Sequence, residues 1–229
     1  MASKNEEILN ILKIMGLEFP LLPVTSSNNI SNNTTNLDDI INKLRYGRIM
    51  IFTDQDVDGS HIKGLIMNLI ETYWPEILEN IPGFLISLAT PILKVLGPEV
   101  KNKREIIKSF YTIPEYDEWI KNNHIPKSWE IKYYKGLGTS ELSDVPEYFR
   151  DFNNKIIQYK KSYENDNEEE KVQHIKESTE KLKLAFDEGC IEARKEWVLN
   201  INKNNIIEQS EKEITFNDFI DRDLIHFSN

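Results

Sequence analysis

Three aspartates alternate along a short stretch of the chain, at Asp54, Asp56 and Asp58, and Gly59 and Ser60 follow them. Alternate side chains of an extended chain point to the same side, so we expect the three carboxylates to gather close together. Like charges at such short range raise one another's pKa unless a cation neutralises them. Carboxylate oxygens are the ligands that suit Mg²⁺ or Mn²⁺. The pattern therefore predicts a divalent metal site.

Two other interpretations fit the same residues. An acidic turn is often only a solvated connection, because Asp and Gly are common turn formers. Asp-x-Asp-x-Asp-Gly also begins an EF-hand calcium loop, but that loop needs a glutamate at its twelfth position, where this chain has Leu65. The EF-hand also needs a helix before the loop, whereas the apolar residues 49–52 predict a buried strand. The pattern therefore does not favour calcium.

A strand and a helix are predicted to position the acids. Residues 49–52 are apolar throughout, which is typical of a central strand covered on both faces, as in a parallel sheet. After the acids, apolar residues recur at helical spacing. They are Ile62, Leu65, Ile66, Leu69, Ile70 and Tyr73. A strand, an acidic turn and a helix make half of a βαβ unit, and active sites of open α/β sheets lie at the carboxyl ends of the strands.

Further motifs follow in a fixed order along nearly the whole chain. They occupy residues 44–50, 53–65, 90–95, 133–140, 194–197, 217–219 and 224–229. In this order they resemble the TOPRIM domain of type IIA DNA topoisomerases, in particular those of eukaryotes and large DNA viruses. The resemblance implies an α/β TOPRIM fold, Rossmann-like with a mostly parallel sheet, and a helical C-terminal extension.

The resemblance also implies a function: part of an ATP-dependent type II topoisomerase, which cleaves and rejoins both DNA strands. Asp54, Asp56 and Asp58 would then hold Mg²⁺, or Mn²⁺ in its place, and ATP would be used by a domain outside this chain. The family's nucleophilic tyrosine and its metal-binding glutamate have no counterpart in the sequence. Tyr46 follows Arg45 as in the family's catalytic dyad, but it precedes the acidic strand. We therefore expect no catalytic residue in this chain, and no activity from it in isolation.

Residues that could bind the DNA backbone, most of them cations, are scattered along the chain. The candidates are Arg45, Arg48, His61, Lys63, Lys135 and Gly136, with Lys155, Lys160 and Lys161 as further possibilities. Gly136 would let the backbone approach a phosphate that Lys135 neutralises. The predicted strand at 129–134 would bring these two residues to the same sheet edge as the acids. Each cation could equally be a solvated surface group, and His61 could instead be structural at the helix start.

Composition limits the class of protein less sharply. The chain has 229 residues, of which 39% are hydrophobic, as in ordinary globular proteins. Its net charge of −10 opposes general attraction to DNA, although a local basic patch can coexist with it. No apolar run approaches the ~20 residues of a membrane span. The single cysteine, Cys190, cannot form an internal disulfide, which fits a reducing compartment.

Three segments are predicted. Residues 1–44 would be a helical and linker segment with a mobile loop rich in Asn, Ser and Thr, residues 45–145 the TOPRIM domain without its first strand, and residues 146–229 the helical extension. The expected partners are double-stranded DNA, the remaining topoisomerase domains or subunits, and a second copy of the complete enzyme, with no membrane. The expected location is the nucleus for a cellular eukaryotic protein, and the host cytoplasm or virion for a viral one.

Two alternative functions remain at this point. One is a free-standing TOPRIM nuclease or primase-like enzyme, which would need its own metal-binding glutamate. The other is a noncatalytic split-subunit fragment that contributes its acids only when docked on partners. Co-purification with a chain that carries the Gly-Asp-Ser motif or the Arg-Tyr dyad would separate them.

Overall fold

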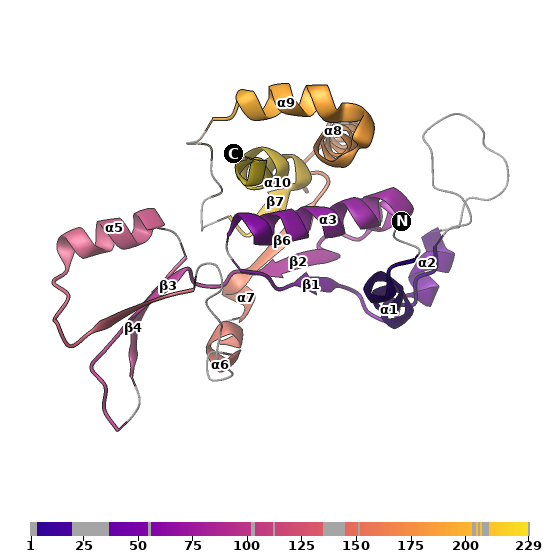
Figure 1. Cartoon of the computed structure of the whole chain (residues 1–229). Helices are drawn as coiled ribbons and strands as arrows, with labels where there is room; N and C mark the ends of the chain where they lie inside the picture. Colours follow the sequence, from indigo (N-terminus) through magenta and orange to yellow (C-terminus); the bar gives the residue numbers. More distant parts are fainter. Residues whose placement is uncertain are drawn as a thin grey trace, which may run out of the picture.

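The protein is a mixed α/β structure, seen in a computed structural model (Figure 1). The structure describes residues 4–19, 37–54, 56–101, 104–111, 113–134, 145–150, 152–202, 205, 207 and 211–228. The strands are β1 (Ile49–Ile51), β2 (Leu85–Leu88), β3 (Leu93–Leu96), β4 (Ile106–Phe110), β5 (Glu130–Tyr133), β6 (Ile156–Lys160) and β7 (Glu213–Thr215). The helices are α1 (Glu6–Met15), α2 (Leu37–Lys43), α3 (Val57–Tyr73), α4 (Pro75–Asn80), α5 (Ile113–Asn122), α6 (Val145–Phe149), α7 (Phe152–Lys155), α8 (Glu168–Phe186), η3 (Glu188–Cys190), α9 (Ile191–Leu199), α10 (Phe216–Arg222) and η4 (Leu224–Ser228).

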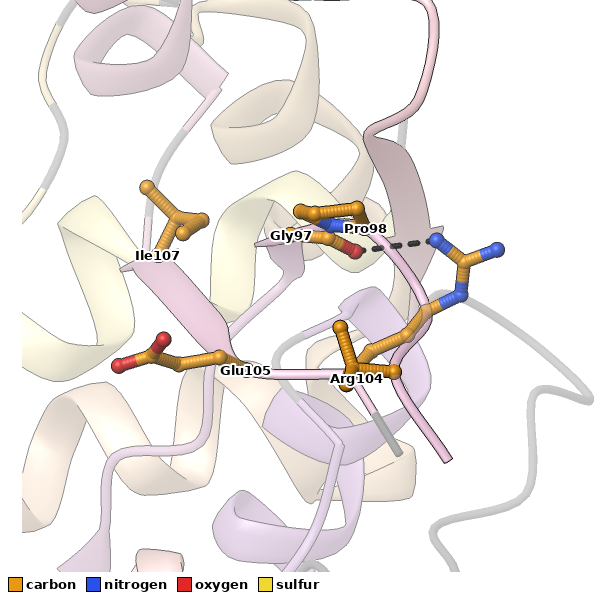
Figure 2. A pocket seen from close by; sticks show the side chains of 6 residues that line it. Gly97, Pro98, Arg104, Glu105 and Ile107 are labelled. Carbon is orange, nitrogen blue, oxygen red and sulfur yellow. Dashed lines mark hydrogen bonds between the residues drawn. The ribbon is translucent and has the colours of Figure 1, made fainter. Parts of the chain in front are cut away.

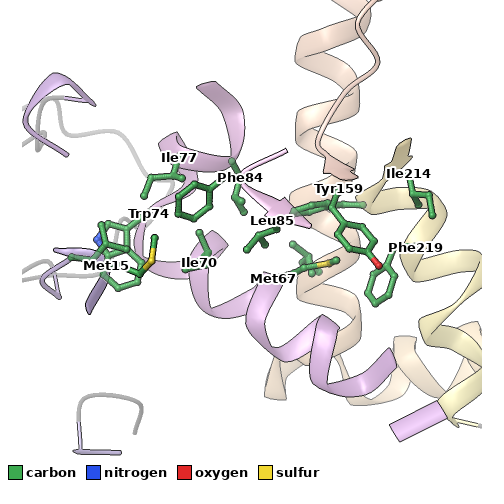
Figure 3. Packing of buried hydrophobic residues seen from close by; sticks show 14 of the residues in the cluster. Met15, Met67, Ile70, Trp74, Ile77, Phe84, Leu85, Tyr159, Ile214 and Phe219 are labelled. Carbon is green, nitrogen blue, oxygen red and sulfur yellow. The ribbon is translucent and has the colours of Figure 1, made fainter. Parts of the chain in front are cut away.

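The main sheet has the strand order β1-β2-β6-β7. β1 pairs with β2 in parallel, β2 with β6 antiparallel, and β6 with β7 in parallel. Helix α3 packs on this sheet beside η4 and α8. Apolar side chains from α3, β2, β6 and α10 meet between the layers, among them Met67, Leu85, Tyr159 and Phe219 (Figure 3). This core fixes the position of α3 on the sheet.

A second, smaller sheet lies to one side of the first (Figure 1). Its order is β4-β3-β5 with antiparallel pairing throughout. Helix α5 covers one face, where Phe110 packs against Tyr116 and Trp119 with ring centroids 5.3 Å apart in each pair. The small sheet thus has an aromatic core of its own.

The position of β1 corrects one prediction. Within the described part of the chain, β1 is an edge strand with β2 as its neighbour, and it is not covered on both faces. Met50 and Phe52 keep 36% and 49% of their surface exposed. An unbroken apolar run does indicate a strand, but it does not reveal which neighbours the strand has.

Two further predictions are confirmed only in part. β5 belongs to the small sheet and not to the main one, but its last residue, Tyr133, pairs with Leu93, which follows shortly after the end of β2, the parallel neighbour of β1. The region after residue 145 is largely helical, as predicted, but it also supplies β6 and β7 to the main sheet. Residues 25–36, the expected Asn, Ser and Thr-rich loop, lie outside the described residues. None of the helices in the described part is long and apolar enough to span a bilayer.

Candidate metal centre and DNA-facing surface

The acidic turn joins the carboxyl end of β1 to helix α3. Asp56 is the N-cap of that helix, and its Oδ1 accepts a hydrogen bond of 2.8 Å from the backbone N–H of Gly59. Aspartate suits this position because its carboxylate satisfies an unpaired N–H and faces the positive end of the helix dipole. Asp54 lies on the exposed side of the turn, two residues earlier.

Asp58 departs from the predicted arrangement. Helix α3 begins at Val57, so Asp58 lies in its first turn, and the extended alternation ends at Asp56. Within the described ranges, no group of three or more His, Cys, Asp or Glu side chains could hold a metal ion. The described residues therefore form no three-carboxylate cluster, and Asp58 lies in the first helical turn and not in the extended stretch.

Asp54 and Asp56 together still suit a divalent cation. Partial burial raises the pKa of Asp54, and the neighbouring charge of Asp56 raises it further. A bound cation would relieve both effects. Mg²⁺ commonly takes one or two carboxylates and completes its shell with water and substrate phosphates. These two residues therefore fit as metal ligands.

The turn packs directly against the first turn of α3. A Cβ added to Gly59 would lie 2.1 Å from the backbone oxygen of Asp54, so no side chain fits at this position. The hydroxyl of Thr53 also donates to the Gly59 oxygen, at 3.5 Å. The position of Asp54 therefore depends on where the helix begins.

The two arginines lie at the other end of β1. Arg48 is exposed. Arg45 is exposed as well, and its Nη1 donates to the Lys13 oxygen at 3.1 Å, while its backbone N–H donates to Met15 at 2.9 Å. Asp54 lies six positions after Arg48, on the far side of β1, which is at most about 20 Å along extended chain. The structure thus does not bring the arginines together with the acids, but it leaves them on the surface.

His61 is partly buried and Lys63 is buried, on the same helix as the acidic turn. The ring of His61 is stacked on Phe186 at 6.1 Å between centroids. The side chain of Lys63 is only 4% exposed, and its ammonium group donates to Asp223 at 3.1 Å. Sequence reasoning treated Lys63 as a surface cation, whereas its side of α3 faces the end of the chain. Lys63 therefore has an internal partner and offers little surface to DNA.

The other lysines also have partners within the protein. Lys160 pairs with Glu213 at 2.6 Å, and Lys161 pairs with Glu71 at 2.9 Å. Lys155 donates to the backbone oxygen of Glu147 at 2.6 Å. The predicted Lys135 and Gly136 lie outside the described residues. Of the predicted cations that the structure describes, Arg45 and Arg48 remain exposed.

A pocket of about 330 Å³ lies elsewhere, at the β3–β4 hairpin of the small sheet (Figure 2). Gly97, Pro98, Arg104 and Ile107 line it, and the Arg104 Nη1 donates a hydrogen bond of 3.0 Å to the Gly97 oxygen. It contains none of the predicted site residues.

Sequence reasoning missed Ser60 and Asp223, which lie next to the acidic turn. The Ser60 hydroxyl donates a hydrogen bond of 2.5 Å to the Asp223 carboxylate.

Comparison with known protein families and sequences shows which family the chain belongs to. Residues 88–229 match the family described as the C-terminal associated domain of TOPRIM, and the chain belongs to this family. It is 39% identical to DNA topoisomerase 2-alpha of Mus musculus and 38% identical to DNA topoisomerase 2 of Arabidopsis thaliana, in each case over 99% of the chain. It spans only 14% and 13% of the length of those proteins.

A solved structure agrees with the sequence relatives. The crystal structure of the Plasmodium falciparum topoisomerase II DNA-binding, cleavage and re-ligation domain superposes with a TM-score of 0.70 at 35% identity. The match covers 99% of this chain and 26% of that one. The resemblance to type IIA topoisomerases and the α/β fold class are thereby confirmed.

Proposed function

We propose that this chain is part of an ATP-dependent type II DNA topoisomerase and supplies Mg²⁺-binding acids and DNA-backbone contacts for cleavage and religation of both strands. The observation that carries the proposal is the Asp54–Asp56 pair at the carboxyl end of β1, where partial burial and the neighbouring charge of Asp56 raise the pKa of Asp54. Similarity to topoisomerase II over 99% of the chain supports it.

The chain's residues have separate roles in this proposal. Asp54 and Asp56 would hold Mg²⁺, with Mn²⁺ as a substitute, and the capping bond from Gly59 would keep the Asp56 carboxylate oriented. The bound ion would stabilise negative charge on the scissile phosphate and on the departing oxygen. Asp58 lies in the first turn of α3, where we assign it a supporting electrostatic role rather than ligation.

DNA contacts would come from the exposed end of β1. Arg45 and Arg48 would bind backbone phosphates away from the metal. His61 stays a proposal, as do Lys135 and Gly136, which lie outside the described residues. The partners would be double-stranded DNA, the remaining topoisomerase domains or subunits, and a second copy of the complete enzyme. ATP would be consumed elsewhere in that enzyme. We place it in the nucleus of a cellular eukaryote, or in the host cytoplasm or virion of a virus.

Mg²⁺-dependent DNA cleavage, together with relaxation of supercoiled DNA, tests the metal assignment. In the complete enzyme that contains this chain, we expect Asp56→Asn to lower Mg²⁺-dependent cleavage by about 100-fold, because a ligand charge is lost. Asp39→Asn, an exposed acid of α2, is the matched control and should leave cleavage unchanged. The 229-residue chain alone should relax nothing with ATP and Mg²⁺. Equal cleavage by the two variants at limiting Mg²⁺ would contradict the proposal, as would relaxation by the chain alone.

Titration of a fluorescent duplex tests the DNA-facing surface. The chain alone should bind weakly, with a shallow dependence on salt, because few phosphates are neutralised. Arg48→Ala should reduce the slope of log affinity against log salt by about one, since one phosphate contact is lost. Lys176→Ala, an exposed lysine of α8, should leave the slope unchanged. An identical slope for Arg48→Ala and the unmodified chain would remove Arg48 from the interface.

A further inference from the structure

The first turn of α3 is anchored by a residue from the far end of the chain. Ser60 and Lys63 lie three positions apart, on one face of the helix, and both are buried. Asp223, directly after α10, binds both of them. Its Oδ1 accepts from the Ser60 hydroxyl at 2.5 Å, and its Oδ2 accepts from the Lys63 ammonium at 3.1 Å. One carboxylate therefore fixes both the rotation and the axial position of the helix start.

This anchor is a charged pair inside the protein. Burial lowers the pKa of Lys63, but interactions with Tyr159 and Asp223 outweigh it, and the pKa is raised overall. Lys63 therefore stays protonated, and its bond to Asp223 is charge-assisted and correspondingly strong. The Tyr159 hydroxyl in turn lies 2.9 Å from that of Ser87 on β2, which ties the anchor to the main sheet.

The same helix turn holds both candidate metal ligands. The backbone N–H of Ser60 donates to the Asp56 oxygen at 3.1 Å, and that of Gly59 donates to the Asp56 carboxylate at 2.8 Å. Gly59 is also in close contact with the backbone of Asp54. A shift of the first turn of α3 would therefore displace Asp54 and Asp56 together.

We infer that Asp223 is a positioning residue for the metal site: through Ser60 and Lys63 it holds the acidic turn in the geometry that a divalent cation needs. Carboxylate ligands must be fixed to within about 0.5 Å to bind a cation well. Asp223 does this without joining the ligand set, since no three-acid cluster forms among the described residues. The inference rests on the proposed metal-binding role of Asp54 and Asp56.

Mn²⁺ titration of the 229-residue chain, followed by electron paramagnetic resonance well below the unfolding temperature, tests the inference. We expect Asp223→Asn to weaken Mn²⁺ binding by about 10-fold, as loss of an outer-shell partner does. Asp221→Asn is the matched control. Asp221 lies two residues before Asp223 in the same segment, but it pairs with Lys181 and not with α3. It should bind Mn²⁺ like the unmodified chain. A residue that only stabilised the fold would not change the affinity of the folded protein.

Hydrogen exchange without metal gives an independent readout. The amide protons of Gly59 and Ser60 should exchange faster in Asp223→Asn and stay unchanged in Asp221→Asn. If Asp223→Asn fails to fold, Ser60→Ala takes its place, with a smaller effect in the same direction, because it removes one of the two bonds to Asp223.

The outcomes separate the inference from the proposed function. If Asp54→Asn leaves Mn²⁺ binding unchanged, the proposed metal role fails, and the exchange rates alone decide whether Asp223 positions the turn. Unchanged exchange at Gly59 and Ser60 would overturn the positioning role. Unchanged Mn²⁺ affinity in Asp223→Asn would also overturn it, provided that the unmodified chain binds through Asp54.

Discussion

Lys161 and Lys94 are both buried lysines, but they lie in regions of very different size. The main core, beside Lys161, gathers eighteen buried apolar residues in the described chain, and the core of the small sheet that carries Lys94 gathers four. Lys161 bonds to Glu71 of α3 at 2.9 Å, to Glu79 of α4 at 3.1 Å and to Thr179 of α8 at 3.2 Å. Its charge thus joins helices that already share a large apolar core.

Lys94 has a different environment. Its ammonium group contacts Glu147 of α6 at 2.6 Å and lies over the rings of Tyr134 and Tyr148, at 4.9 and 5.1 Å from their centroids. Glu147 also accepts from the Ser109 hydroxyl at 2.9 Å. Lys94 therefore links the small sheet to α6. The comparison shows that a buried lysine can stabilise a whole core in one region and only the contact between two elements in another.

The largest effect should follow from Lys161→Ala. It leaves Glu71, whose side chain is 8% exposed, without its cation, and we expect the free energy of unfolding to fall by about 3–5 kcal/mol. Urea denaturation measures this. Lys176→Ala removes an exposed lysine of α8 and should cost less than about 0.5 kcal/mol. Similar losses in the two variants would show that the Lys161 cluster does not support the main core.

Lys94→Ala should have a smaller and more local effect. Glu147 keeps 18% of its side-chain surface exposed, so water can solvate the carboxylate that is left, and we expect a loss of about 2–3 kcal/mol. Hydrogen exchange should rise first in β3, β4 and β5, while β2 and β6 stay protected. Lys108→Ala, a half-exposed lysine of β4, is the control and should change little. An equal rise of hydrogen exchange in both sheets would show that the effect of Lys94 is not local, and would contradict the contrast with Lys161.

Local sequence patterns predicted the part of the site that is built locally. The apolar residues 49–52, the acids and the helical spacing after them correctly indicated strand, turn and helix. The local signals also set a limit, because the alternation of acids does not reveal that α3 begins at Val57, which puts Asp58 in the first helical turn.

Contacts between distant residues could not be predicted in this way. Lys63 and Asp223 are separated by 160 positions, and neither residue carries a local signal that it is buried. The same holds for Lys161 and Glu71, which are 90 positions apart. Tertiary packing decides whether a lysine is a surface cation or an internal partner, and Lys63, Lys155, Lys160 and Lys161 all have partners inside the protein.

Asp54→Asn should barely change stability, in contrast to the buried lysines. The pKa of Asp54 is raised, so the folded protein holds this proton more tightly than the unfolded chain does, and the ionised carboxylate opposes folding above that pKa. Removing its charge should therefore change the free energy of unfolding at pH 7 by no more than about 0.5 kcal/mol, toward greater stability. Mg²⁺ should then stabilise the unmodified chain and not the variant. A large loss of stability would assign Asp54 a structural role.

The smallest effect concerns a partly buried pair at the start of α8, where the Nδ1 of His174 lies 2.6 Å from Asp166. The hydrogen bond to Asp166 raises the pKa of His174, partial burial opposes this, and the charges of Asp166, Glu177 and Glu170 add to it. A raised histidine pKa contributes stability that is fully present below the unfolded value of 6.5 and is lost as the pH rises through the folded value. Urea midpoints from pH 5 upward should therefore show His174→Gln to be less stable than the unmodified chain at the acidic end, by a difference that fades above about pH 6.5. Asp166→Asn should lower the pKa of His174 followed by NMR, and an unchanged pKa would mean that Asp166 is not its partner in solution.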